Sequence, residues 1–135
     1  MNENTTDWTG LREFKAVLLD QSFILTWALE SDSLLLDLDL CLSQEHPFYE
    51  KPRPSEIKCI RPAIIEFPAC SSVSVNTAAR DTPKLGDIVR SLGAGAIAGF
   101  RRTGEGIYEV SGSFGAVQIF AERPILRIKA AGQDN

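Results

Sequence analysis

The sequence predicts a mainly β protein, either an antiparallel β-sandwich or a small, partly closed barrel, with about seven or eight strands and one or two short helices. Two apolar runs, residues 23–29 and 34–40, are separated only by Glu30-Ser31-Asp32-Ser33. In the C-terminal third, short alternating segments follow one another with glycine or proline between them. Short strands at regular spacing with turn signals are typical of both architectures.

The two apolar runs are predicted to pair as an antiparallel hairpin. Four apolar pairs then lie opposite one another: Leu29 with Leu34, Trp27 with Leu36, Leu25 with Leu38, and Phe23 with Leu40. Side chains alternate faces along a strand, so a slip of one residue would break every pair. The hairpin is therefore expected to have one dry face, with Asp37 and Asp39 on the opposite face.

Two short helices are predicted, one within residues 7–16 and one at 83–92. The first has three apolar residues about one turn apart, namely Trp8, Leu11 and Phe14. The second begins with Thr82-Pro83, which fits an N-cap followed by proline at the first helical position. Its apolar face consists of Leu85, Ile88, Val89 and Leu92.

Further strands are expected after the hairpin. The segment 56–67 alternates and places one set of residues on one face: Ile57, Cys59, Arg61, Ala63, Ile65 and Phe67. Because Pro62 and Pro68 cannot donate to a ladder, this strand is predicted to lie at an edge or to be bulged. Short strands are also expected at 71–75 and 125–129.

The C-terminal third is predicted to be a meander. Residues 97–103 and 107–113 flank Gly104-Glu105-Gly106, which suits a three-residue hairpin loop. This loop sets Phe100 opposite Val110 and Arg101 opposite Glu109. A following turn at Phe114-Gly115 is expected to set Val110 opposite Ile119 and Gly112 opposite Val117.

The length of 135 residues predicts one domain, with residues 1–6 and 131–135 as disordered tails. The N-terminus has neither the basic region nor the apolar stretch of a signal peptide, and no run approaches the roughly 20 apolar residues that span a bilayer. A cytoplasmic protein without a membrane partner is therefore expected.

The net charge of −4 argues against a nucleic-acid partner, because that affinity comes mainly from Lys and Arg on phosphates. The charge is uneven: residues 1–56 hold eleven acids and four bases, and residues 57–135 hold seven acids and ten bases. Either strands of the two halves pair and neutralise each other, or an acidic surface recognises a basic partner.

The three cysteines, Cys41, Cys59 and Cys70, lie in strand-like segments. An odd count without C-x-x-C spacing argues against a disulfide framework or a zinc site. They are interpreted as small buried hydrophobes, and neither a metal nor a cofactor is predicted.

The loop 44–55 is the predicted binding site by position. It carries three prolines and no periodicity, and long ordered loops on a β scaffold often carry binding residues. Its candidate residues are His46, Phe48, Tyr49 and Arg53. Aromatic residues and arginine are among the residue types that often anchor protein interfaces. The alternative is a structural lid with Phe48 buried.

Three other groups of residues are candidates for chemistry or ligand binding. Asp37 and Asp39 can hold a cation, act as an acid/base pair, or form an acidic surface that contacts a partner. The simpler interpretation is that they lie on the solvated face of a strand. The glycine-rich segment 93–99 lacks the pattern of a phosphate loop and is interpreted as a close approach of two backbones. Four arginines can form a modest basic cluster: Arg101, Arg102, Arg123 and Arg127.

Three segments carry a resemblance: Glu45-His46-Pro47-Phe48-Tyr49-Glu50, Cys59-Ile60-Arg61-Pro62-Ala63 and Gly112-Ser113-Phe114-Gly115. In these segments the chain resembles small uncharacterised bacterial single-domain proteins, over roughly residues 20–130. The resemblance implies no catalytic residues. Toxin-neutralising immunity proteins are similar in size and acidity, which is an analogy without a motif.

The leading functional expectation is a non-enzymatic protein-binding module that uses loop 44–55 and the strand face bearing Asp37 and Asp39. The most specific version of this expectation is an immunity protein. A second hypothesis is a carrier of a small apolar ligand in a barrel cavity lined by Trp27, Phe23, Phe100 and Tyr108. A third is a hydrolase or metal enzyme that combines His46 with the two aspartates. The oligomeric state is left open.

Overall fold

The computed structural model describes residues 6–47, 49, 51, 59–75, 89 and 92–128. The described elements are β1 (Thr6–Asp7), the 3-10 turns η1 (Trp8–Gly10) and η2 (Arg12–Phe14), β2 (Val17–Glu30), β3 (Ser33–Leu42), β4 (Cys59–Phe67), β5 (Ser72–Val75), β6 (Gly95–Gly104), β7 (Ile107–Gly112), β8 (Gly115–Phe120) and β9 (Ile125–Ile128). Every strand pair is antiparallel. The prediction of a mainly β antiparallel fold is confirmed.

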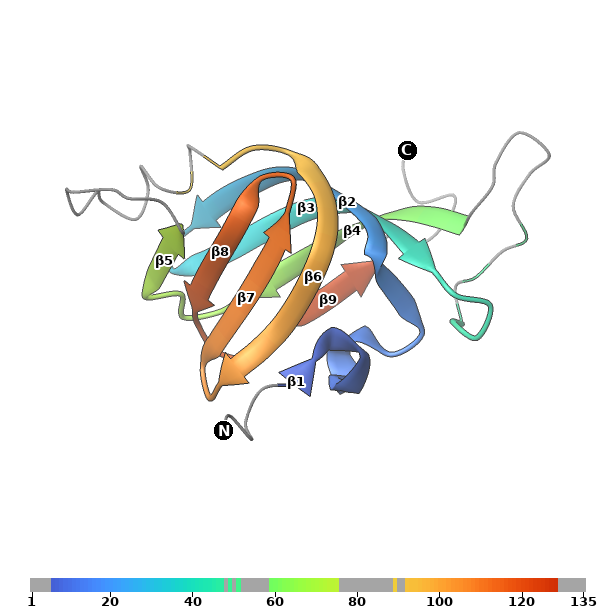
Figure 1. The fold of residues 1–135 in the computed structure, drawn as a ribbon, viewed down its shortest axis with the longest axis horizontal. Helices are drawn as coiled ribbons and strands as arrows, with labels where there is room; N and C mark the ends of the chain where they lie inside the picture. The colour runs from blue at the N-terminus through green and yellow to red at the C-terminus, as the bar shows by residue number, and fades with distance from the viewer. Residues whose placement is uncertain are drawn as a thin grey trace.

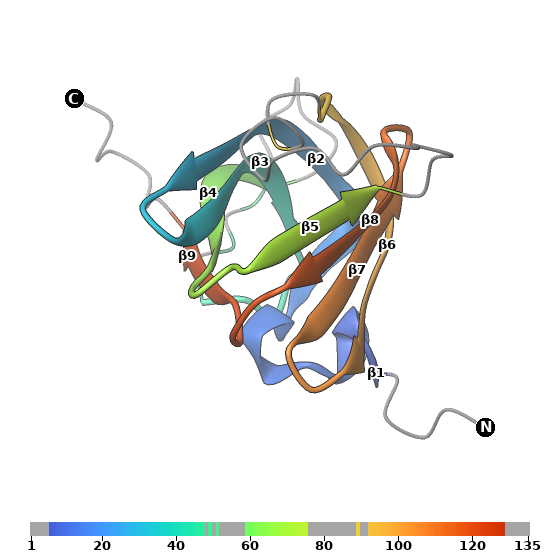
Figure 2. The ribbon, with the colours of Figure 1, turned by 90° about the vertical axis from the view of Figure 1, so that its left-hand side faces the viewer.

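The strands form one sheet that is not closed, in the order β5-β8-β7-β6-β2-β3-β4-β9. The long strand β6 pairs with β7 on one side and with both β2 and β1 on the other. Figure 1 shows β6 curving across the molecule beside β7 and β8, and Figure 2 shows the layer of β5, β8 and β7 facing the layer of β2, β3 and β4. Because β6 belongs to both layers, the arrangement is intermediate between a sandwich and a partly closed barrel.

Two pairs of strands bend at the same place in the fold. β4 pairs with β9, and their chain neighbours β5 and β8 pair with each other. Between the two ladders, the Glu122 N–H donates to the Pro68 carbonyl and the Ser71 N–H donates to the Phe120 carbonyl, each over 2.9 Å. Ala69 has a φ of 51°, which lets the chain bend sharply after β4.

The first hairpin keeps the predicted register only near its turn. Leu29 lies opposite Leu34 and Trp27 opposite Leu36, as expected. A bulge then shifts the pairing by one residue, so Leu38 lies opposite Ile24 and Asp39 lies opposite Phe23. The predicted pairs of Leu25 with Leu38 and of Phe23 with Leu40 are therefore wrong.

The bulge decides which apolar residues of β2 enter the core. Ile24 is fully buried, whereas the exposed fractions of Phe23 and Leu25 are 42% and 43%. Strict alternation from Trp27 would have buried the opposite set, because a one-residue shift moves every later side chain to the other face.

A wider irregularity follows between Leu18 and Phe23, where β2 has more residues than β3. Ser22 fills it. Its Oγ accepts the Cys41 N–H at 2.9 Å and donates to the Leu18 carbonyl at 2.8 Å. The side chain therefore links β2 to β3 where the pairing is irregular.

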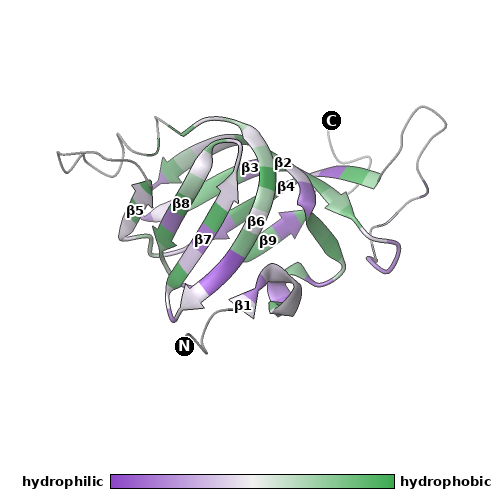
Figure 3. Cartoon of the chain, in the orientation of Figure 1, coloured by the Kyte–Doolittle hydropathy of each residue, from purple (hydrophilic) through white to green (hydrophobic). Residues whose placement is uncertain are grey.

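The core contains four aromatic rings packed against one another. Phe14 lies edge-on to Phe100 with ring centroids 4.9 Å apart, and Phe67 lies 6.1 Å from Phe100 and 5.6 Å from Tyr108. All four side chains are almost completely buried. Figure 3 shows β6 changing from hydrophobic to hydrophilic along its length as it leaves this core.

The predicted register of the meander is confirmed at the first turn, but it is shifted at the second turn. Phe100 lies opposite Val110 and Arg101 opposite Glu109, as predicted. In the next pair, Val110 lies opposite Val117 and Gly112 opposite Gly115, two residues away from the expected pairing. The turn starts one residue earlier, at Ser113, and the shift of two leaves the inward face unchanged.

The N-terminal segment forms two 3-10 turns in place of the predicted helix at 7–16. Leu11 and Phe14 are nevertheless buried, because residues three apart also share a face in a 3-10 turn. Thr6, expected in the tail, pairs with Arg102 in β1 and β6.

The predicted helix at 83–92 lies largely outside the described residues. Within it, Val89 is helical and buried. Apart from Thr6, the predicted tails at 1–6 and 131–135 also lie outside the described residues.

The strands at 59–67, 72–75 and 125–128 match the predicted ones, but β4 is not an edge strand. It lies between β3 and β9. Pro62 is exposed and lies just before the stretch Ala63–Glu66 that pairs with β9. Its missing N–H therefore falls outside that ladder, which is why proline is accepted there.

Candidate functional site

The strongest candidate site is the outward surface of β2, β3, β4 and β9, which we call the outer face. It is the side opposite Leu34, Leu36, Leu38 and Leu40, all of which are buried. The register places its residues in three rows: Phe23, Asp39 and Pro62; then Thr26, Asp37, Ile64 and Arg127; then Ala28, Leu35, Glu66 and Ile125. The face thus combines apolar residues with two adjacent carboxylates on β3.

Large apolar side chains are exposed on the outer face. In the described part of the chain, the large hydrophobic residues with exposed fractions above 40% are Phe23, Leu25 and Ile125. The register places Phe23 and Ile125 on these strands, and Leu25 lies in the bulge of β2. Single exposed apolar residues are ordinary, but grouped ones mark interaction surfaces. The bulge in β2 turns Phe23 and Leu25 outward together, whereas Ile125 lies three strands away on β9.

The two aspartates share this face, as the sequence predicted, and differ in their partners. Asp37 Oδ2 accepts a hydrogen bond from the Thr26 hydroxyl at 3.1 Å. Among the described residues, Asp39 has no ion-pair partner, although Phe23 and Pro62 flank it. A negative charge beside exposed apolar groups favours a contact that supplies both a cation and apolar surface.

The third carboxylate of the outer face is neutralised. Glu66 forms an ion pair with Arg127 at 2.5 Å and accepts a hydrogen bond from the Ser33 hydroxyl at 3.1 Å. Its environment therefore differs from that of Asp37 and Asp39, so the negative character of the face is concentrated on β3.

The predicted loop 44–55 is described only at 44–47, 49 and 51. The Ser43 N–H donates to the Ala16 carbonyl, and the Tyr49 N–H donates to the His46 carbonyl at 2.9 Å. Tyr49 is partly buried and packs against the core. Partial burial lowers the pKa of His46 from its usual value of 6.5.

Phe48 and Arg53 lie outside the described residues, so the choice between binding loop and lid stays a prediction. The packing of Tyr49 gives the lid hypothesis one supporting contact.

The enzyme hypothesis gains no support from the described geometry. His46, Asp37 and Asp39 do not form a group able to hold a metal, and no other trio of such residues does so in the described ranges. Cys41, Cys59 and Cys70 are buried, as predicted. Burial raises the pKa of the Cys70 thiol, which makes it a poorer nucleophile.

The carrier hypothesis names four lining residues: Trp27, Phe23, Phe100 and Tyr108. Phe23 is on the outer face, while Phe100 and Tyr108 pack in the aromatic core. Trp27 donates its indole N–H to the Gly93 carbonyl at 2.9 Å and meets Phe114 edge-on at 5.3 Å. The carrier hypothesis therefore stays a prediction.

The glycine-rich segment is a close backbone approach, as the sequence predicted. A Cβ on Gly95 would clash with the Ser113 hydroxyl, and a Cβ on Gly112 would clash with the Ala96 carbonyl. The ring of Phe114 covers both glycines. The segment therefore serves packing between β6 and the β7–β8 turn.

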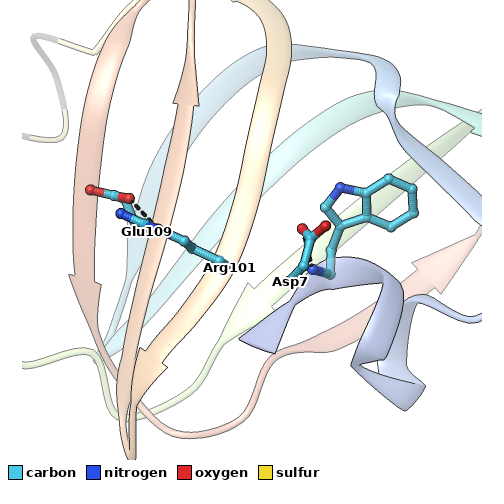
Figure 4. Close-up of polar contacts among 4 residues, drawn as sticks. Asp7, Arg101 and Glu109 are labelled. Atoms are coloured by element: carbon cyan, nitrogen blue, oxygen red, sulfur yellow. Dashed lines mark hydrogen bonds and ion pairs between the residues drawn. The ribbon is translucent and has the colours of Figure 1, made fainter. Parts of the chain in front are cut away.

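Three of the four arginines of the expected basic cluster form ion pairs with carboxylates. Arg101 pairs with Glu109 at 2.7 Å (Figure 4). Figure 4 also shows Asp7, which lies on the neighbouring strand β1. Arg123 pairs with Glu13 and Arg127 with Glu66, each at 2.5 Å.

Glu13 has an unusual environment that the sequence did not indicate. Burial acts to raise the pKa of its carboxyl group. The hydrogen bond from Arg123, its own backbone N–H, and the charges of Arg123 and Arg12 outweigh burial, so the pKa lies below its usual value. This pair joins η2 to the segment between β8 and β9.

Comparison with known proteins gives no relative. No protein-family model matches the chain, and no curated protein or solved structure matches it. The resemblance to small bacterial proteins therefore stays a prediction. No helix in the described part of the chain is long and apolar enough to cross a membrane.

The sequence pattern indicated the acidic half of the outer face but not its apolar half. The alternation of β3 places Asp37 and Asp39 outward directly. The exposure of Phe23 and Leu25 depends on a bulge, and no glycine or proline in β2 signals its position.

Proposed function

We propose that this protein is a non-enzymatic protein-binding module that uses the outer face to bind its partner. The observation that carries the proposal is the placement of exposed Phe23 and Leu25 beside Asp37 and Asp39 on adjacent strands. Aromatic and aliphatic anchors surrounded by charged groups are the usual chemistry of binding hot spots.

The partner chemistry follows from the charges. No cation of the described residues pairs with Asp39, which lies between Phe23 and Pro62, so a partner that presents apolar side chains with Lys or Arg beside them complements the surface. Neutralisation of a basic toxin, as expected from the analogy to immunity proteins, is the specific form of this proposal. The loop 44–55 remains part of the proposed site through His46, Phe48, Tyr49 and Arg53.

The test is affinity capture from a lysate of the source cells with three tagged proteins: wild type, Phe23→Ser/Leu25→Ser and Asp37→Asn/Asp39→Asn. The captured partner is then purified and its Kd measured for each. We expect both double variants to weaken binding at least about tenfold, since central apolar anchors often contribute more than about 1.4 kcal/mol.

The matched control is Glu105→Gln/Glu122→Gln, which removes two exposed carboxylates elsewhere. It should bind like wild type. Equal affinity of all four proteins would refute the outer face as the binding surface. A Phe48→Ala/Tyr49→Ala/Arg53→Ala variant reports separately on the loop.

A further inference from the structure

A surface groove of about 520 Å³ lies between the N-terminal segment and the start of β2, next to the end of β3. It is separate from the outer face, and nothing in the sequence pattern pointed to it. Its volume falls within the range of roughly 300–1,000 Å³ that is typical of small-molecule sites.

The groove has apolar walls. Trp8 and Leu18 line it and are partly exposed, and Leu11 lines it while 6% exposed. Partly exposed apolar side chains around a concavity offer surface that a ligand can bury.

The two sides of the groove carry charged residues of opposite sign. Arg12 and Lys15, on the N-terminal segment, line it and are exposed, and no described carboxylate lies within ion-pair distance of either. Glu45 lines the opposite side, where its Oε1 accepts a hydrogen bond from the Ser43 hydroxyl at 3.0 Å. The N-terminal side therefore offers two cations to an anion.

The backbone holds the two sides together. Ala16, which lines the groove, has a φ of 64°, and its carbonyl accepts the Ser43 N–H at 3.0 Å. A non-glycine residue in this conformation is uncommon and is kept by the surrounding contacts. The groove is thus formed before any ligand arrives.

We infer that this groove binds a small amphiphile, an apolar chain or ring that carries a carboxylate or a similar anion. The anion lies against Arg12 and Lys15, and the apolar part covers Trp8, Leu11 and Leu18. The inference is independent of the outer face.

The test is titration of the full chain with decanoate below its micellar concentration, followed by calorimetry and tryptophan fluorescence. The chain has two tryptophans, Trp8 and Trp27, and Trp27 is buried. We expect saturable binding with a fluorescence change that disappears in Trp8→Phe. Decanol and decyltrimethylammonium, which have the same chain without an anion, should bind at least about tenfold more weakly.

The charge reversal Arg12→Glu/Lys15→Glu should raise the Kd for decanoate by about tenfold or more, while Lys51→Glu, an exposed lysine outside the lining, leaves it unchanged. Circular dichroism checks that each variant is folded. The inference is overturned if decanoate does not bind, if the cationic amphiphile binds equally well, or if the charge reversal has no effect. Binding to anionic phospholipid vesicles without binding to monomeric decanoate also overturns it.

Discussion

The hydroxyl group of Ser22 accepts the N–H of Cys41 at 2.9 Å across the irregular part of the first hairpin. Ser22 is 2% exposed and also donates to the Leu18 carbonyl. One buried side chain therefore links Cys41 of β3 to Leu18 of β2 where the pairing between the two strands is irregular.

Removal of the Ser22 hydroxyl should destabilise the protein. We expect Ser22→Ala to lower the free energy of unfolding by about 1–3 kcal/mol, because it removes the buried hydroxyl that accepts the Cys41 N–H and donates to the Leu18 carbonyl. Urea denaturation measures the change. Ser74→Ala, on an exposed position of β5, should stay within about 0.5 kcal/mol of wild type. Equal stability of the two variants would contradict the role of Ser22.

The register of β2 is tested by two neighbouring residues. Ile24→Ala should cost about 2–5 kcal/mol, since it opens a cavity in the core. Leu25→Ala should cost no more than about 0.5 kcal/mol, because that side chain is exposed. Unbulged pairing predicts the opposite order, so equilibrium unfolding of the two variants separates the two registers.

The close approach of β6 and the β7–β8 turn makes Gly112 indispensable. Gly112→Ala should destabilise by about 1–3 kcal/mol, because the added Cβ meets the Ala96 carbonyl, a backbone atom that cannot rotate away. Gly93→Ala is the matched control, since no atom lies within 4 Å of its Cβ position. Thermal unfolding that shifts equally in both variants would argue against the contact.

Glu13 gives stability a pH dependence. Its folded-state pKa lies below the usual value despite the effect of burial, so its ion pair with Arg123 contributes stability above the unfolded-state pKa. That contribution disappears as the pH falls through the folded-state pKa. Glu13→Gln should therefore be less stable than wild type at pH 7, and the two proteins should converge in acid. Denaturation at a series of pH values measures this, and a difference that does not change with pH would refute it.

The sequence predicted the elements of this fold better than their pairing. Alternation in β3 and β4 identified the buried leucines and placed Asp37 and Asp39 outward. The loop glycines fixed the Phe100–Val110 register. The pairing failed where an extra residue near Leu25 shifts the ladder, because the bulge buries Ile24 in the tertiary structure, which no local pattern reveals.

The candidate site was predictable only in part for the same reason. The two aspartates follow from strand periodicity, but the exposure of Phe23 and Leu25 follows from the bulge. The groove beside Trp8 depends on the contact between Ala16 and Ser43, residues far apart in the chain. Long-range backbone contacts of this kind have no signature in a single sequence.

The central claim is that a partner protein docks on the outer face, and site-specific photo-crosslinking tests it most directly. A benzophenone side chain would replace Phe23, and separately Ala98, an exposed residue of β6. We expect position 23 to give one discrete adduct in a lysate of the source cells, reduced by Asp37→Asn/Asp39→Asn, and position 98 to give none. No adduct from position 23, or the same adducts from both positions, would contradict the account.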